Sequence, residues 1–326
     1  MDFRTTFNIE KPVFTLGYAD PVLFAGSCFA NEIGGKMAGG KMKALVNPCG
    51  TVYNPASIES VLRLALSDRV FTARDLSCYE DRYFSFLHYT DFSSYNPSES
   101  VEKINHSTRL AHDFLKEASF LFITFGTARV YTYLETGKIV SNCHKLPGNL
   151  FSSSLLSVDS IVGSWFTLLD DLKSFNPALR VIFTISPVRH WKDGAHGNQV
   201  SKSHLFIAIE ELMKHPLSGG YFPAYELVMD DLRDYRFYEN DMLHPSSEAV
   251  NYIWEKFTEA YFSSEAVSTW TEVSNVLRAL KHRLPERPGK AEMQFSRKMT
   301  ARVEALQKKF GFLDFSDELE YFRSLS

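Results

Sequence analysis

The sequence lacks the features that mark a membrane protein, a metal-binding ribbon or a nucleic-acid binder. No stretch approaches the run of about 18 uninterrupted apolar residues that indicates a membrane-spanning helix. The four cysteines include no pair at the CxxC spacing of zinc ribbons and thioredoxin-like sites. Basic residues are in deficit, with 35 Lys and Arg against 39 Asp and Glu, so the net charge of −4 gives no field that attracts phosphates. We therefore expect that the protein binds no membrane, no metal and no nucleic acid.

Glycine and proline are also sparse, which excludes collagen-like and disordered chains. The 326 residues contain 17 Gly and 13 Pro, while aromatic residues make up 14%. The hydrophobic fraction of 44% and the charged fraction of 23% are typical of a soluble globular protein. Four thiols in a chain of this size indicate a reducing compartment, and the first residues show no apolar signal-peptide core. We therefore expect a cytoplasmic protein.

Short apolar runs alternate with stretches of helical periodicity over most of the chain. We expect strands over residues 21–25, 42–46, 119–125, 180–185 and 224–229. We expect helices over residues 28–37, 55–66, 98–117, 155–175, 201–215 and 245–262. This alternation indicates an α/β fold, in which a parallel sheet carries helices on both faces.

Two other regions depart from this alternation. Tyrosine and phenylalanine crowd residues 69–96, which we interpret as an irregular or hairpin-like insertion. Strands stop at about residue 263, so we expect an α/β body over 1–262 and a helical extension over 263–326. Within the extension, a linker is expected over 285–288 and a charged amphipathic helix over 290–309.

Ser27 directly follows the first expected strand and stands at the start of the next expected helix. In an open α/β sheet, ligands bind at the carboxyl ends of the strands, so this serine lies at the functional edge. A helix amino terminus there would offer N–H groups and a positive dipole end to an oxyanion. A plain helix cap or turn residue is the other interpretation of this serine.

Asp241 and His244 lie three residues apart, just ahead of the last helix expected in the body. Pro245 suits a first helical position, which predicts that His244 occupies a loop-to-helix junction at the same edge as Ser27. Within one turn the carboxylate can bond to the imidazole, which fixes its tautomer and supports its protonated form. A lone histidine is more often structural, but with Ser27 this pair completes a candidate catalytic triad.

The segment around Ser27 also resembles a known family. Residues 26–30 (GSCFA) spell the signature of the GSCFA domain family, which is related to the SGNH (GDSL-like) esterases. In the same order, the chain contains residues 47–55 (NPCGTVYNP), 125–128 (FGTA), 142–145 (NCHK), 186–190 (SPVRH) and 241–245 (DMLHP). The likeness spans about residues 20–262. It implies a three-layer, flavodoxin-like fold in which Ser27 is the nucleophile and the Asp241–His244 pair activates it.

Two departures from the SGNH pattern lie close to the site. SGNH enzymes contribute an asparagine to the oxyanion hole from a Gly-x-Asn-Asp block, but the matching residues 126–129 hold Ala128 at that position. Cys28 stands where an aspartate usually follows the nucleophile. The lost donor must therefore be replaced by other groups. The candidates are the N–H groups of Ser27 and Gly50 and the side chains of Asn142 and His144, which follow the third long strand in a hairpin region.

Arg189 and His190 follow the fourth expected strand at the same edge of the sheet. These two residues suit the binding of an acidic or hydroxylated group of a substrate. A loop salt bridge and a packed imidazole are equally compatible with the sequence.

Together these residues predict a serine esterase that hydrolyses a short-chain or carbohydrate O-acyl ester of a small or glycan-like alcohol, without a metal or organic cofactor. A carbohydrate O-acyltransferase is an alternative, because a second alcohol can replace water in resolving the acyl-enzyme. A catalytically silent ligand-binding module is another, because the oxyanion asparagine is missing. Cys28 is a less favoured nucleophile, since neighbouring helical side chains point about 100° apart and only one can face His244. The oligomeric state is left open.

Overall fold

The computed structural model describes residues 4–67, 69–280 and 289–324, which form two compact units. The first unit contains Met1–Pro12, Pro21–Gly35 and Ala44–Ala260, and the second contains Val13–Asp20, Lys36–Lys43 and Tyr261–Ser326. The expected division into residues 1–262 and 263–326 remains a prediction.

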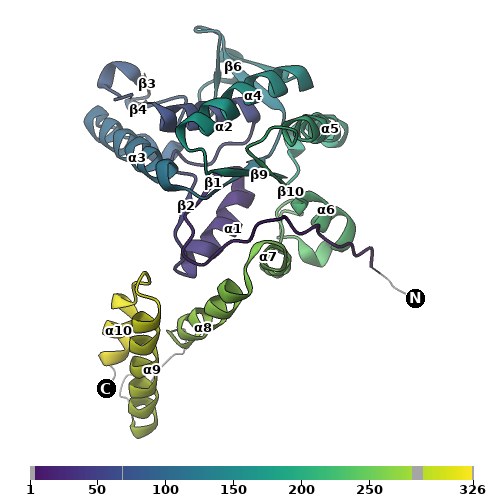
Figure 1. The fold of residues 1–326 in the computed structure, drawn as a ribbon. Helices are drawn as coiled ribbons and strands as arrows, with labels where there is room; N and C mark the ends of the chain where they lie inside the picture. The colour runs from purple at the N-terminus through teal and green to yellow at the C-terminus, as the bar shows by residue number, and fades with distance from the viewer. Residues whose placement is uncertain (1–3, 68, 281–288, 325–326) are drawn as a thin grey trace. The chain divides into compact units, whose positions relative to one another are not determined.

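A five-stranded parallel sheet forms the centre of the first unit (Figure 1). In spatial order the strands are β2 (Ala44–Val46), β1 (Val22–Gly26), β5 (Phe120–Phe125), β9 (Arg180–Ile185) and β10 (Ser218–Phe222). This is the 2-1-3-4-5 strand order of flavodoxin-like folds, so the fold class expected from the sequence is confirmed. Because the strands are parallel, the ends of β1, β5 and β9 bring Ser27, Gly126 and Ser186 to one edge of the sheet.

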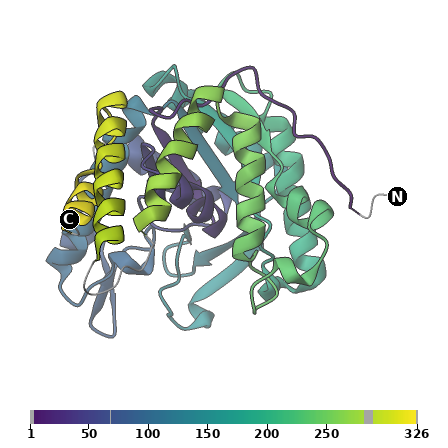
Figure 2. The same cartoon turned by 90° about the horizontal axis from the view of Figure 1, so that it is seen from below.

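The strand residues are apolar towards both faces, and helices cover both. Every residue of β5 is buried, as expected for a strand with no solvated face. Leu121 and Ile123 join a core cluster on one face, whereas Phe122 packs on the opposite face against Phe24 and Phe257, with ring centroids 5.2 and 5.1 Å away. The first face carries α2 (Pro55–Leu66), α3 (Pro97–Glu117), α4 (Val158–Phe175) and α5 (Gly194–Leu212). The second face carries α1 (Cys28–Gly39) and α7 (Ser247–Tyr261), which Figure 2 shows in front of the strands.

The position of the fifth strand differs from the prediction. The expected strand over 224–229 is helical, as α6 (Ala224–Glu226) and a π-helical turn, η5 (Leu227–Asp231). The strand is β10 instead, which contains two glycines and lacks a strong apolar run. Gly220 has φ 107° and marks a shift in register against β9, so the glycine accommodates a bulge at the sheet edge.

Two small antiparallel sheets lie outside the main sheet. The insertion over 69–96 contains the hairpin β3 (Ser77–Tyr79) and β4 (Arg82–Phe84), which confirms its hairpin-like character. The hairpin expected after the third strand is formed by β6 (Arg129–Tyr133) and β7 (Lys138–Val140). A third strand, β8 (Phe151–Leu155), pairs with β6, so the helix expected from residue 155 begins only at Val158.

The second unit contains α8 (Ser264–Leu280), α9 (Lys290–Lys309) and α10 (Ser316–Arg323). The bounds of α9 match the predicted amphipathic helix, whereas the linker expected over 285–288 lies outside the described residues. The segment Lys36–Lys43 of the same unit packs against these helices. Lys41 forms an ion pair of 2.9 Å with Glu318, and a Cβ on Gly40 would lie 1.9 Å from the Trp270 ring, so only glycine fits there. Among the described residues, no helix combines the length and apolarity needed to cross a membrane.

Candidate active site

Ser27 sits in a tight turn between β1 and α1. Gly26 has φ 139°, and a Cβ there would lie 2.2 Å from the carbonyl oxygen of Thr124, so the turn requires glycine. The Ser27 N–H donates to that same oxygen at 3.1 Å, which holds the serine against the end of β5. The residue is only 1% exposed, and its Oγ has no hydrogen-bond partner among the described residues. Leaving a buried hydroxyl without a partner costs free energy.

Asp241 and His244 form a pre-assembled acid–base pair. Asp241 Oδ2 lies 2.6 Å from His244 Nδ1, and Asp241 Oδ1 accepts the N–H groups of His244 and Leu243 at 2.9 Å each. These bonds, the backbone N–H of His244 first, lower the pKa of Asp241 to about 2. The carboxylate therefore stays ionised and orients the imidazole through Nδ1, leaving Nε2 to face a reaction partner.

The segment that carries His244 is not the expected helix start. Pro245 pairs with Tyr238 in an isolated antiparallel bridge, and the Ser246 N–H donates to Phe237 O at 2.8 Å. The helix α7 begins at Ser247, two residues after the start expected at Pro245, so His244 lies in the loop that precedes this helix. The bridge satisfies backbone groups that a helical Pro245 would have left for solvent or a cap.

The described conformation brings Asp241 and His244 together but does not join them to Ser27. The imidazole is about half exposed (48%), whereas Ser27 Oγ is buried and makes no hydrogen bond within the described part of the chain. The Ser–His contact that the sequence predicts is therefore not formed here. Catalytic hydrogen bonds are often long or poorly aligned before substrate binds, and the catalytic roles of the three residues stay predictions.

The end of β5 passes close to Ser27. A Cβ on Gly126 would lie 3.3 Å from Ser27 Cβ and 3.0 Å from Tyr53 O, and the Gly126 N–H donates to Tyr53 O at 2.7 Å. Burial raises the pKa of Tyr53 to about 12, and its ring meets the His190 ring edge-on at 5.9 Å. A small residue at 126 thus permits the close approach of three segments around the serine.

The backbone groups expected to bind an oxyanion already have partners. The Ser27 N–H donates to Thr124 O, and the Gly50 N–H donates to Asn47 O at 2.8 Å. Ala128 is fully buried in the core cluster, and its N–H donates to Ser201 Oγ at 2.7 Å. In this conformation, none of these N–H groups is free to stabilise an oxyanion.

The hairpin residues expected to replace the missing asparagine also have other contacts. Asn142 Nδ2 donates to Thr90 Oγ1 at 3.2 Å. The His144 ring stacks on Phe84 with centroids 4.3 Å apart, and its Nε2 lies 2.9 Å from Ser85 O. Burial lowers the pKa of His144, which favours the neutral imidazole. These contacts tie the hairpin region to the aromatic insertion, and the proposed donor role stays a prediction.

His190 and Cys28 lie at the same edge of the sheet, and burial shifts the pKa of both side chains. Burial lowers the pKa of the His190 imidazole. The backbone N–H of His190 donates to Asn198 Oδ1 at 2.8 Å. Burial raises the pKa of the Cys28 thiol, so the thiolate needed for a cysteine nucleophile is disfavoured.

Lys202 is a buried residue of this edge that sequence reasoning missed. Its side chain is fully buried, and Nζ donates to Gly126 O at 2.7 Å and to Ser186 O at 2.6 Å. Burial lowers the pKa of Lys202 to about 7. The signal was present in the sequence, because Lys202 lies three residues before Leu205 and seven before Ile209 on the apolar face of α5.

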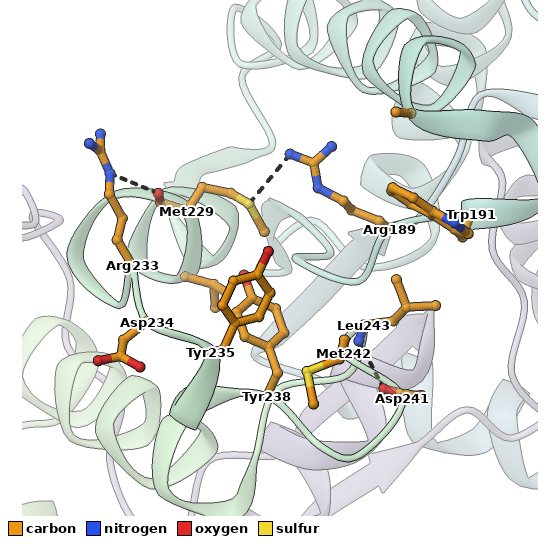
Figure 3. Close-up of a pocket in the computed structure, with 12 residues that line it drawn as sticks. Arg189, Trp191, Met229, Arg233, Asp234, Tyr235, Tyr238, Asp241, Met242 and Leu243 are labelled. Atoms are coloured by element: carbon orange, nitrogen blue, oxygen red, sulfur yellow. Dashed lines mark hydrogen bonds between the residues drawn. The ribbon is translucent and has the colours of Figure 1, made fainter.

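A cavity of about 640 Å³ lies between the segment that follows β9 and the segment that carries Asp241 (Figure 3). Arg189, Trp191, Met229, Tyr235, Tyr238 and Asp241 are among its lining residues. Within the described ranges, no group of three or more His, Cys, Asp or Glu side chains could hold a metal ion.

The family match covers most of the chain. The GSCFA family matches residues 21–257, which include Ser27 and the Asp241–His244 pair. The chain belongs to the GSCFA family. Residues 273–325 match a second family, described as the C-terminal domain of GSCFA domain proteins. A search of curated proteins finds no match for this GSCFA chain.

Solved structures with some likeness to this GSCFA protein are distant. One is a protein described as a GDSL-like lipase from Parabacteroides merdae, with 15% identity and a TM-score of 0.33 over 76% of this chain and 98% of that one. Another is a carbohydrate esterase of family 3 from Talaromyces cellulolyticus, with 9% identity and a TM-score of 0.31 over 78% and 99%. At these distances, the reaction has to be argued from the residues of this chain.

Proposed function

We propose that the protein is a serine esterase in which Ser27 is the nucleophile, His244 the general base and Asp241 the orienting carboxylate. The observation that carries the proposal is the 2.6 Å contact between Asp241 Oδ2 and His244 Nδ1, together with the two N–H groups that anchor the same carboxylate. The unpartnered hydroxyl of Ser27 supports it, because such a group is available for proton transfer to His244.

In the proposed reaction, Ser27 Oγ attacks the acyl carbonyl while His244 Nε2 takes the hydroxyl proton. The alkoxide of the leaving alcohol receives that proton, and water then releases the acid from the acyl-enzyme. The Ser27 hydroxyl makes no hydrogen bond in the described conformation, so the proposed proton transfer requires a contact between Ser27 Oγ and His244 Nε2 that forms when substrate binds. The substrate class we propose is a short-chain acyl ester of a small or glycan-like alcohol.

A binding module without catalysis is the second candidate. The observation that favours it is the engagement of the expected N–H donors, since Ser27 and Gly50 both donate to backbone carbonyls. Losing one oxyanion donor typically costs about 2.7–4 kcal/mol of barrier, so a protein without any would be a poor esterase.

Hydrolysis of p-nitrophenyl acetate and labelling by a fluorophosphonate probe separate these candidates. The esterase proposal predicts turnover by the wild type, no turnover by Ser27→Ala, and a probe adduct that peptide mapping places on Ser27. Ser203→Ala is the matched control, because Ser203 is a partly exposed residue of α5 whose hydroxyl donates to Gln199 O within the same helix. A probe adduct on another residue, or turnover retained in a folded Ser27→Ala protein, would refute the proposal. Formation of a new ester from the acyl group and an added alcohol would show acyl transfer in place of hydrolysis.

A further inference from the structure

The cavity beside Asp241 has the features of a ligand site. Trp191 and Tyr235 are large aromatic side chains, yet 55% and 78% of their surfaces are exposed. Both line the cavity together with Tyr238, whose ring lies 6.2 Å from that of Tyr235 (Figure 3). Exposed aromatic rings around a concave surface offer flat apolar faces to a ring-shaped ligand.

Arg189 lines the same cavity and has no acidic partner. Its side chain is half-buried, and the polar contact it makes is a long one of 3.9 Å to Met229 Sδ. No described carboxylate lies within ion-pair distance of this guanidinium, so the loop salt bridge considered for it is not formed.

The acidic residues around the cavity are already paired elsewhere. Their contacts are Asp230 with Arg233 at 3.1 Å, Asp234 with Arg236 at 3.5 Å and Asp241 with His244 at 2.6 Å. Arg233 therefore differs from Arg189, although both line the cavity, because its charge is offset by Asp230. Among the described lining residues, Arg189 therefore carries a charge that no ion pair offsets.

The field of this guanidinium acts on its neighbours. Arg189 lowers the pKa of the nearby Lys202 in addition to the larger effect of burial, and it opposes the burial that raises the pKa of Tyr225 and Tyr238. A partly buried cation without a partner is unfavourable, and an anion beside it would offset that cost. Guanidinium presents a planar fork of donors that matches a carboxylate in two parallel bonds.

We propose that this cavity binds a ring that carries a carboxylate, with the carboxylate on Arg189 and the ring against Trp191 or Tyr235. That the ligand is part of the ester substrate rests on the proposed function, because Asp241 of the acid–base pair lines the same cavity. Both an acidic sugar and an aromatic acid offer this chemistry, and the probes below distinguish them.

Isothermal titration of the full chain with two matched pairs of probes tests the proposal. The sugar pair is methyl β-D-glucuronoside and methyl β-D-glucoside, and the aryl pair is benzoate and benzyl alcohol. In at least one pair, the carboxylate member should bind at least about tenfold more tightly, as expected for a charge-assisted contact. Arg189→Gln should abolish this preference, whereas the control Arg233→Gln should retain it. Equal binding within both pairs, no binding of either carboxylate, or a preference that survives Arg189→Gln would overturn the proposal.

The same titrations separate this inference from the proposed function. Ser27→Ala removes the nucleophile but leaves the cavity, so it should bind the preferred probe as the wild type does. If the wild type binds carboxylates through Arg189 but hydrolyses no ester, the cavity proposal stands and the esterase proposal fails. If it hydrolyses p-nitrophenyl acetate but shows no preference within either pair, the esterase proposal stands and the cavity proposal fails.

Discussion

Replacing Lys202 with methionine tests the electrostatics of the candidate site. The wild-type ammonium is fully buried between Gly126 O and Ser186 O, and burial lowers its pKa to about 7 from an ordinary value of 10.5. Because the folded pKa is the lower one, the unfolded chain binds this proton more readily. The stability that Lys202 contributes is therefore complete above pH 10.5 and is lost as the pH falls towards 7.

The magnitude follows from the difference between the two pKa values. One pH unit is worth about 1.4 kcal/mol, so the free energy of unfolding should rise by about that amount per unit between pH 7 and 10.5, or by about 5 kcal/mol in total. Lys202→Met removes this dependence. It also leaves two carbonyl acceptors without a donor, at about 1–3 kcal/mol each, but this loss is the same at every pH.

Chemical denaturation of both proteins at pH 7.5, 8.5 and 9.5 measures the effect. The free energy of unfolding of the wild type minus that of Lys202→Met should increase by about 3 kcal/mol over these two units. Lys192→Met, which removes an exposed lysine instead of a buried one, is the control for the loss of a positive charge. A difference that stays constant from pH 7.5 to 9.5 would refute the reasoning, since Lys202 would then titrate as it does in the unfolded chain.

Three further tests concern the Asp241–His244 pair, the side-chain amide of Asn142 and the turn at Gly26. Because the pKa of Asp241 is lowered to about 2, the rate of p-nitrophenyl acetate hydrolysis should show no titration step of this carboxylate between pH 3.5 and 5. Asp241→Asn, which removes the carboxylate that orients His244, should lower turnover by about 10⁴-fold. Asn142→Ala should lower kcat by about 10²-fold with little change in KM if the amide binds the oxyanion; a drop under about threefold would contradict that role. In denaturation experiments, Gly26→Ala should lower the free energy of unfolding by about 3 kcal/mol or more, because a Cβ there would lie 2.2 Å from a carbonyl oxygen. The control Gly35→Ala, within α1, should raise it by up to about 1 kcal/mol. Equal effects of the two substitutions would contradict the argument that the turn requires glycine.

The sequence predicts the strands of the main sheet that are buried on both faces. β5 and β9 are short, mostly apolar runs of six residues rich in β-branched and aromatic residues, which favours strands over helices. Their alternation with amphipathic helices indicates parallel strands. β10 escaped prediction because its pairing depends on the neighbouring β9, whereas its own residues are mostly glycine and polar. A strand at a sheet edge is stabilised by the ladder it joins more than by its own composition.

The candidate site could be predicted only where its contacts are local. Asp241 and His244 are three residues apart, so their hydrogen bond follows from the geometry of a single turn. The bond between Asn142 and Thr90 joins residues 52 positions apart, and no sequence pattern indicates it. Lys202 stood on an apolar helical face, where a charged residue is rare without a partner, but its partners are backbone carbonyls that carry no signature in the sequence.

The charges of Lys202 and Arg189 connect the buried edge with the cavity. Arg189 disfavours the charged form of Lys202, since it contributes to the lowered pKa of that lysine. A carboxylate bound to Arg189 would reduce that repulsion, raise the pKa of Lys202 and draw a proton onto it near neutral pH. By linkage, the affinity for the carboxylate must then fall as the pH rises through about 7, and binding near pH 7.5 must take up a fraction of a proton. Titrations in two buffers of different ionisation enthalpy measure that proton directly. Proton uptake that occurs in the wild type and disappears in Lys202→Met would show that carboxylate binding at Arg189 is coupled to protonation of Lys202. Equal heats of binding in both buffers would show that the two cations act independently.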